Sequence, residues 1–108
     1  MDGLIKDYWT ANGLVKPQRV VVCAACKMGS IIFAGARHWD SVMRSQLDLL
    51  GGYDKMIAIY GKEEQGFIDQ FGEFMTRKEA LEVAIKAGQK INWERNGSKT
   101  GLFSEGLY

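Results

Sequence analysis

The sequence predicts an α+β fold, a small and mainly antiparallel sheet with two or three helices packed on it. Two observations lead to this class. Apolar runs at residues 20–26 and 30–34 are separated by a short Met-Gly-Ser turn, which is typical of an antiparallel hairpin. Residues 65–89 then combine two further short strands, a tight turn at Phe71-Gly72 and a helix with its own start and stop signals.

The composition indicates one compact domain over residues 1–108. Of these 108 residues 46% are hydrophobic and 25% charged, and the formal net charge is +1. Because positive and negative residues nearly cancel, the protein has no strongly basic overall charge. We therefore expect neither a long nucleic acid nor a membrane as partner. No apolar run approaches the ~18 residues of a spanning helix, and the first residues lack a signal-peptide pattern. We therefore expect a cytosolic protein.

The first half of the chain contains the predicted central strand. Leu4, Ile5, Tyr8 and Trp9 have helical spacing, which predicts one or two helical turns before Asn12-Gly13 breaks the pattern. Residues 18–27 are apolar on both faces, as in a strand that is covered on both sides. The small residues at 24 and 25 leave space there for a helix, a partner or a ligand.

A strand-to-helix loop follows at residues 35–40. Gly35 permits a close backbone approach, and Asp40 is the predicted N-cap of a helix that runs to about Leu50, with Met43, Leu47 and Leu50 buried. Arg37 and His38 lie in this loop, where binding residues are often held by a rigid scaffold. An ordinary alternative is equally open: Arg37 pairs with a surface carboxylate, and His38 caps a carbonyl.

The remaining elements are predicted from shorter patterns. Residues 55–60 alternate as a strand, residues 61–64 form a solvated turn, and Ile91 and Trp93 form a short extended piece. This gives about five strands in all. The apolar tail at residues 102–108 is expected to dock onto the body of the protein.

The predicted helix in the 65–89 unit places an arginine at an unusual position. Thr76 and Glu79 have the spacing of a capping box, and Gly88 suits a left-handed C-cap. Arg77 then lies in the first turn, beside the positive end of the helix dipole, where a guanidinium needs an anionic partner. Phe67 and Phe74 on the preceding hairpin would suit ring stacking, although aromatic residues in a hairpin are more often core.

Motifs for catalysis, metals and cofactors are absent from the sequence. It contains no phosphate-binding glycine motif, no Ser-His-Asp order and no paired carboxylates. Cys23 and Cys26 form a lone Cys-x-x-Cys within a strand, so their side chains should point to opposite faces as inert thiols. With His38 the only histidine, we expect no enzyme, no metal and no cofactor.

Several motifs in order resemble a known family. They are Val-Cys-Ala-Ala-Cys, Ile-Ile-Phe-Ala-Gly-Ala-Arg-His, Gln-Gly-Phe-Ile-Asp-x-x-Gly-x-Phe-x-Thr-Arg-Lys-Glu-Ala, Ala-Gly-Gln and Leu-Phe-Ser-Glu-x-Leu-Tyr. Together they span residues 20–108 and are similar to small phage and prophage proteins, in particular the first Thoeris anti-defence family. Members of that family sequester cyclic ADP-ribose isomers made by bacterial TIR-domain enzymes. Gly106 departs from the pattern, in which an acidic residue is expected.

The resemblance implies a non-enzymatic sponge in the cytoplasm of the infected bacterial host. It also implies a homo-oligomer, a dimer or hexamer, and a second site for cyclic oligonucleotides of CBASS immunity. The residues carried over are Arg37, His38 and Arg77 for phosphates, Phe67 and Phe74 for stacking, Asp69 for ribose hydroxyls, Ser104 and Glu105 as further ligand residues, and Arg44 for the second site.

Two other functions remain open at this point. The chain could be a phage regulatory protein that inhibits or controls a host protein by binding it. It could also be an enzyme that degrades the nucleotide. The fate of the ligand distinguishes all three, because only a sponge retains it intact.

Overall fold

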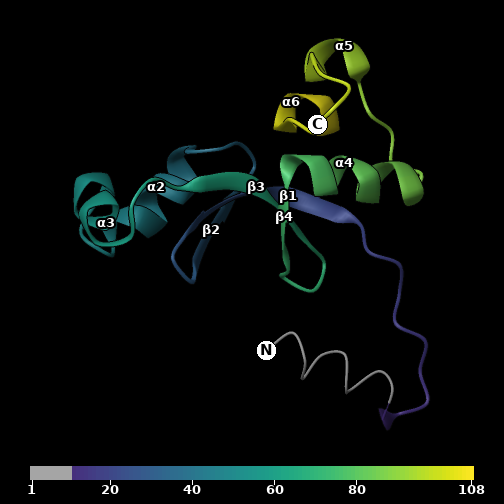
Figure 1. Cartoon of the computed structure of the whole chain (residues 1–108), viewed down its shortest axis with the longest axis horizontal. Coiled ribbons are helices and arrows are strands. Elements are labelled where there is room, and N and C mark those ends of the chain that lie inside the picture. The colour runs from purple at the N-terminus through teal and green to yellow at the C-terminus, as the bar shows by residue number, and fades with distance from the viewer. Residues whose placement is uncertain (1–10) are drawn as a thin grey trace.

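The computed structural model describes residues 11–108 and confirms the α+β class, with a four-stranded antiparallel sheet (Figure 1). The helical turns expected around Leu4 and Trp9 lie outside the described residues. The strand order is β2-β1-β3-β4. The elements are β1 (Val21–Met28), β2 (Ile31–Gly35), α2 (Ser41–Asp48), α3 (Tyr53–Tyr60), β3 (Glu64–Asp69), β4 (Phe74–Thr76), α4 (Arg77–Lys86), α5 (Trp93–Asn96) and α6 (Ser104–Leu107).

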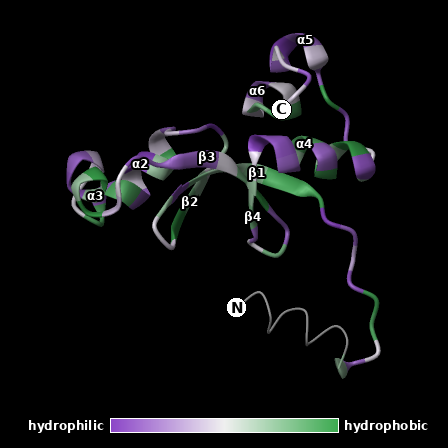
Figure 2. Cartoon of the chain, in the orientation of Figure 1, coloured by the Kyte–Doolittle hydropathy of each residue, from purple (hydrophilic) through white to green (hydrophobic). Residues whose placement is uncertain are grey.

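The predicted central strand is confirmed, because β1 lies between β2 and β3. Figure 2 shows the hydrophobic residues along β1. Alternate residues of the sheet point to one face, where they join a core cluster with α2, α3 and α4: Ala24, Cys26, Met28, Phe33, Phe67 and Met75. The opposite face carries Lys27, Ile32 and Phe74, which are partly or largely exposed. The helices therefore cover one face of the sheet, not both faces as predicted for residues 18–27.

The 65–89 unit folds as the sequence predicts. β3 and β4 form the hairpin, and Gly72 at its turn has a φ of 79°. Thr76 accepts from the backbone N–H of Glu79, and the Glu79 carboxylate accepts from the N–H of Thr76, which completes the capping box. Gly88 beyond the helix adopts a left-handed φ of 71°.

Asp40 is the N-cap of α2, as predicted, and its carboxylate accepts from the N–H of Met43. Met43 and Leu47 are buried, but Leu50 is 42% exposed. The helix ends at Asp48, so Leu50 falls in the turn beyond it and leaves the buried face.

The strand expected at residues 55–60 is wrong, because this segment is the helix α3. Short apolar runs do not distinguish strand from helix by alternation alone. Reading from Tyr53 instead of Lys55, the residues Tyr53, Met56, Ile57 and Tyr60 have the i, i+3, i+4, i+7 spacing of a helical stripe. Glycines with positive φ bound it on both sides. The sheet consequently has four strands rather than five.

The extended piece expected at Ile91 and Trp93 is also wrong at Trp93, where the helical turn α5 begins. Asn92 caps this turn by accepting from the N–H of Arg95, and Gly97 ends it with a φ of 67°. The tail docks as predicted, since Leu102 is fully buried and α6 packs beside α5. Among the described residues, no helix is long and apolar enough to cross a membrane.

Gly106 is where the sequence departs from the acidic residue of the resembled family, and its surroundings explain the glycine. A Cβ atom at this position would lie 2.5 Å from the Cβ of Asn96. Gly106 also accepts the N–H of Asn92 at 2.8 Å, which joins α6 to α5. An acidic side chain would force these two turns apart.

Candidate functional site

The loop between β2 and α2 is held by Asp40 and Gly35. Asp40 accepts from the backbone N–H groups of Met43 and Arg37, and these hydrogen bonds lower the pKa of its carboxyl. A Cβ at Gly35 would lie 2.5 Å from Oδ1 of Asp40, so the close approach expected of this glycine is confirmed. The loop therefore presents Arg37 and His38 from a fixed turn.

Arg37 holds the C-terminal segment. Its Nη1 donates to the main-chain oxygen of Ser104 at 2.9 Å, and its Nη2 donates to the main-chain oxygen of Tyr108. The guanidinium also lies over the ring of Tyr108, 4.8 Å from its centroid. Among the described residues, Arg37 does not pair with a carboxylate side chain, which was the ordinary alternative that the sequence left open.

His38 reaches from the β2–α2 loop to β3. Its Nε2 lies 2.8 Å from the main-chain oxygen of Gly66, so this nitrogen carries the proton and donates it. Its ring meets Phe67 edge-on, at 5.4 Å. Burial lowers the pKa of His38, which keeps the imidazole neutral near pH 7. The capped carbonyl expected as the ordinary alternative is confirmed.

Arg77 reaches from the start of α4 to the same segment. Its Nη1 donates to the main-chain oxygen of Leu102 at 3.0 Å, and its Nη2 donates to Oε1 of Gln65 at 2.8 Å. The guanidinium lies 4.2 Å from the ring centroid of Phe103. Burial lowers the pKa of Arg77 from its usual value, although the side chain stays charged near pH 7.

Ser104 and Glu105 complete what we call the tail cluster: Arg37, His38, Arg77, Ser104 and Glu105. The hydroxyl of Ser104 donates to Glu105, and Ser104 itself is 1% exposed. The pKa of Glu105 is lowered by its own backbone N–H, by Ser104 and by the positive charge of Arg37. The structure thus brings together five residues that the sequence proposed from three separate segments.

Phe67 and Asp69 are buried, so a ligand cannot reach their side chains. Phe67 is fully buried in the core. Asp69 is 2% exposed, and its carboxylate accepts from the N–H groups of Phe71 and Glu73 in the β3–β4 turn. Arg19 donates to its other oxygen at 2.7 Å. The roles of ring stacking for Phe67 and ribose binding for Asp69 are therefore corrected to core packing and turn formation.

Phe74 lies on the other face of the sheet, away from the tail cluster. It lines a broad hollow of about 610 Å³ together with Lys27, whose Nζ lies 5.7 Å from the ring centroid. Carboxylates also line this hollow, among them Glu64 and Glu79. Phe74 therefore does not lie beside Arg77 in the tail cluster, although the resemblance carries both over as ligand residues.

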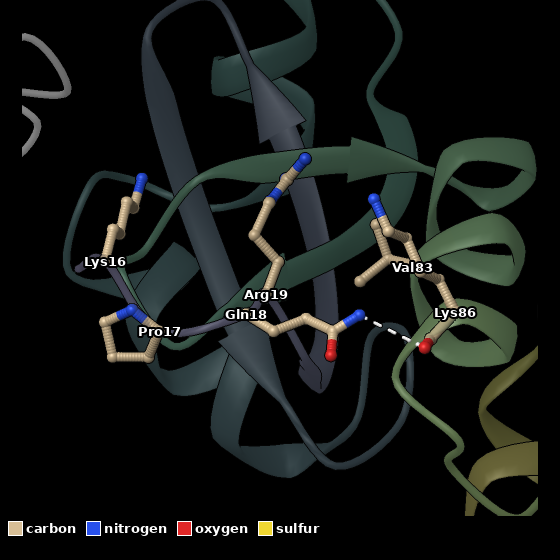
Figure 3. Close-up of a pocket in the computed structure, with 6 residues that line it drawn as sticks. All are labelled: Lys16, Pro17, Gln18, Arg19, Val83 and Lys86. Carbon is tan, nitrogen blue, oxygen red and sulfur yellow. Dashed lines mark hydrogen bonds between the residues drawn. The ribbon is translucent and has the colours of Figure 1, made fainter.

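Figure 3 shows a second hollow, of about 370 Å³, between the segment before β1 and the end of α4. Gln18 crosses it, and its amide Nε2 donates to the main-chain oxygen of Lys86 at 3.1 Å. Two of its basic residues are already near carboxylates. Lys16 lies 4.0 Å from Glu73, and Arg19 contacts Asp69. This pairing makes the hollow a weak site for an anion.

The two cysteines are free, as expected. Cys26 is fully buried and Cys23 is half-buried. Burial raises the pKa of the Cys26 thiol to about 12 and also raises that of Cys23. A protonated thiol is a poor nucleophile, so neither cysteine is arranged for covalent chemistry.

Sequence reasoning missed several residues around these sites. Tyr108 accepts the backbone N–H of Ala24 through its hydroxyl, and so fills the space predicted beside the small residues of β1. Gln65 positions Arg77. Trp39 and Tyr53 line a hollow with Arg44 that lies apart from the tail cluster. No local pattern marks Tyr108 or Gln65, because their partners Ala24 and Arg77 lie 84 and 12 positions away.

Comparisons with known proteins give one match. The model of the family described as Phage T4 y16D protein matches residues 20–108. No curated protein and no solved structure matches the chain. The matched region includes every described strand and helix from β1 to α6.

Proposed function

Since the chain belongs to the phage T4 y16D protein family, we propose that this phage protein is a non-enzymatic sponge for a cyclic nucleotide signal of bacterial immunity. The proposed ligands are cyclic ADP-ribose isomers of Thoeris, with cyclic oligonucleotides of CBASS as a further class. It would act in the cytoplasm of the infected host. The tail cluster is the proposed phosphate site.

One observation carries this proposal: the two arginines of the tail cluster lack a carboxylate side chain as a partner. Within residues 11–108, neither Arg37 nor Arg77 has a side-chain carboxylate within 4.0 Å, whereas Arg19 has two. Their hydrogen-bond partners are main-chain oxygens and the amide of Gln65. Arg77 is a half-buried cation whose hydrogen-bond partners are uncharged, so it retains an attraction for phosphate, to which a guanidinium fork is well matched.

The other members of the cluster support binding rather than turnover. His38 is neutral near pH 7, and its Nε2–H is donated to Gly66, so this N–H is not free to protonate a leaving group. Glu105 is exposed and ionised near pH 7, and can accept a ribose hydroxyl in place of the buried Asp69. These assignments are part of the proposal.

Ligand recovery tests the proposal directly. The purified protein is incubated with cyclic ADP-ribose isomers and with cyclic di- and trinucleotides, separated from free ligand, heated and analysed by chromatography. We expect intact cyclic ligand in the released fraction. A linear product would show an enzyme instead, and no retention of any cyclic nucleotide would refute the sponge.

An Arg77→Ala variant tests the site. We expect a loss of about 1.5–3 kcal/mol of binding free energy, because a charge-assisted bond to phosphate disappears. Arg77 also braces the tail, so circular dichroism must show that the variant remains folded. Lys62→Ala, in the exposed turn before β3, is the matched control for charge. Unchanged affinity in folded Arg77→Ala would remove Arg77 from the site.

A second candidate is a phage regulatory protein that binds a host protein. It is favoured by the exposed apolar side chains of the α2–α3 end, which are Val42, Leu49, Leu50, Ile59 and Tyr60, between 42% and 87% exposed. Such a patch also suits the proposed homo-oligomer. Co-purification of a host protein, without a thermal shift by any cyclic nucleotide, would favour this candidate over the sponge.

A further inference from the structure

A hollow beside α2 and the start of α3 has the composition of a binding site. It has a volume of about 290 Å³ and is lined by Trp39, Arg44, Leu47 and Tyr53. The floor is apolar, since Leu47 is 4% exposed, and Arg44 is the charged residue among those that line it. This volume is at the lower end of ligand pockets and holds one ring system with a substituent.

The two aromatic walls form a rigid corner. The rings of Trp39 and Tyr53 meet at 89°, with centroids 5.7 Å apart. Trp39 is supported from behind by Phe33, at 5.8 Å. The hydroxyl of Tyr53 donates to Glu63 at 2.9 Å, which fixes the second ring although Tyr53 is 41% exposed. Two rings at right angles offer a planar ligand one wall to stack on and a second wall to meet edge-on.

Among the described residues, Arg44 lines the hollow and has no carboxylate partner. Its Nε donates to the main-chain oxygen of Trp39 at 2.8 Å, which holds the guanidinium at the rim of the hollow. Within residues 11–108, its two Nη groups have no hydrogen bond or ion pair. They are free to donate to an anion in the fork geometry that guanidinium groups prefer.

Trp39 carries two further unusual features. Among the residues that the structure describes, Trp39 is the non-glycine residue with a positive φ, which is 53°. Its Nε1–H is buried and has no hydrogen-bond partner there. A bulky residue in this conformation and an unpaired buried donor both reduce stability, and such features gather at functional sites.

We propose that this hollow, formed by Trp39, Arg44, Leu47 and Tyr53, is a binding site for a planar aromatic ring that carries an anionic group. The ring packs in the corner of the two aromatic residues, and the anion accepts from the Nη groups of Arg44. This site contains Arg44, which the resemblance assigns to a second nucleotide site, so the inference rests on that part of the proposed function. It does not share a side chain with the tail cluster, so it stands whether or not the tail cluster binds phosphate.

The test uses adenosine monophosphate, adenosine and inorganic phosphate with the full chain. Binding is measured by calorimetry and by the NMR signal of the Trp39 indole N–H, assigned with a Trp39→Phe variant. We expect adenosine monophosphate to shift this signal and to bind at least tenfold more tightly than adenosine. Inorganic phosphate alone should not shift it. If the nucleotide leaves the signal unchanged, or phosphate binds as well as the nucleotide, the proposal is wrong.

Variants distinguish this hollow from the tail cluster. Arg44→Gln should lower the affinity for adenosine monophosphate to that for adenosine, and should leave adenosine binding unchanged. Tyr53→Leu should weaken both ligands. Arg95→Gln, an exposed arginine on α5, is the control and should bind as the unaltered chain does. Nucleotide binding that survives Arg44→Gln and is lost in Arg77→Ala would belong to the tail cluster and would overturn the proposal.

Discussion

Gly66 shows how one residue can serve both the sheet and the candidate site. Its main-chain oxygen accepts from His38, and a Cβ at this position would lie 2.0 Å from the main-chain oxygen of Met75 in β4. The strand pair β3–β4 can approach this closely only because residue 66 has no side chain. The glycine therefore sets the position of the carbonyl that orients His38.

We predict that Gly66→Ala lowers the free energy of unfolding by about 1–3 kcal/mol, because β4 must shift to admit the methyl group. Urea unfolding measures this change. Lys62→Ala is the control at an exposed position and should change stability by less than about 0.5 kcal/mol. An equal effect in both variants would contradict the close β3–β4 contact.

His38 predicts a pH dependence of stability. Its pKa in the folded protein lies below the ordinary value of 6.5, so the unfolded chain takes up the proton first on acidification. The contribution of His38 is therefore complete above about pH 6.5, and it is lost as the pH falls toward the folded pKa, by at most about 1.4 kcal/mol per pH unit.

The variant His38→Gln isolates this effect, because His38 is the only histidine of the chain. Its free energy of unfolding should fall less than that of the unaltered chain between about pH 7 and pH 5. The same fall in both proteins would show that other groups carry the acid sensitivity.

At the scale of elements, the C-terminal segment depends on one buried amide. Asn96 is 4% exposed, and its Nδ2 donates to the main-chain oxygens of Ser98 and Gly101. Its Oδ1 accepts the N–H of Phe103 at 2.7 Å. These bonds shape the loop that leads into α6, and they place Phe103 where it can stack on Arg77.

We predict that Asn96→Ala destabilises the protein by about 1–3 kcal/mol, because three backbone groups lose their buried partner. The measurement is chemical unfolding, combined with tryptic digestion of the tail. Asn92→Ala, which removes a cap at an exposed position, should cost about 1 kcal/mol and serves for comparison. If Asn96→Ala left both stability and digestion unchanged, the amide would not be what holds the tail.

At the scale of the whole molecule, the central strand β1 and the helix α3 differ in how firmly they are packed. β1 is paired on both sides and its residues Ala24, Ala25 and Cys26 are fully buried. In α3, Met56 is the buried residue, while Ile59 and Tyr60 are 58% and 45% exposed. A helix of eight residues has little stability of its own and relies on such packing.

We therefore predict that backbone amides of α3 exchange with deuterium much faster than those of β1. Exchange followed by mass spectrometry measures the difference. The experiment is repeated at several protein concentrations, because self-association over α3 would slow its exchange as the concentration rises. Equal protection of α3 and β1 at all concentrations would contradict the picture of a weakly held helix.

Local patterns determined much of this fold. The hairpin of β1 and β2, the N-cap at Asp40 and the capping box of Thr76 and Glu79 each depend on residues a few positions apart. The sequence by itself also indicated that the tail docks, because a run as apolar as residues 102–108 is costly to expose.

The tertiary structure decided the rest. Residues 53–60 became a helix bounded by two glycines, although the alternation at residues 55–60 was equally consistent with a strand. Tyr108, Leu102 and Arg19, which are partners of Arg37, Arg77 and Asp69 respectively, lie 71, 25 and 50 positions away. A side chain's chemistry can be read from the sequence, but whether that chemistry faces a ligand or the protein itself depends on which distant segment packs against it.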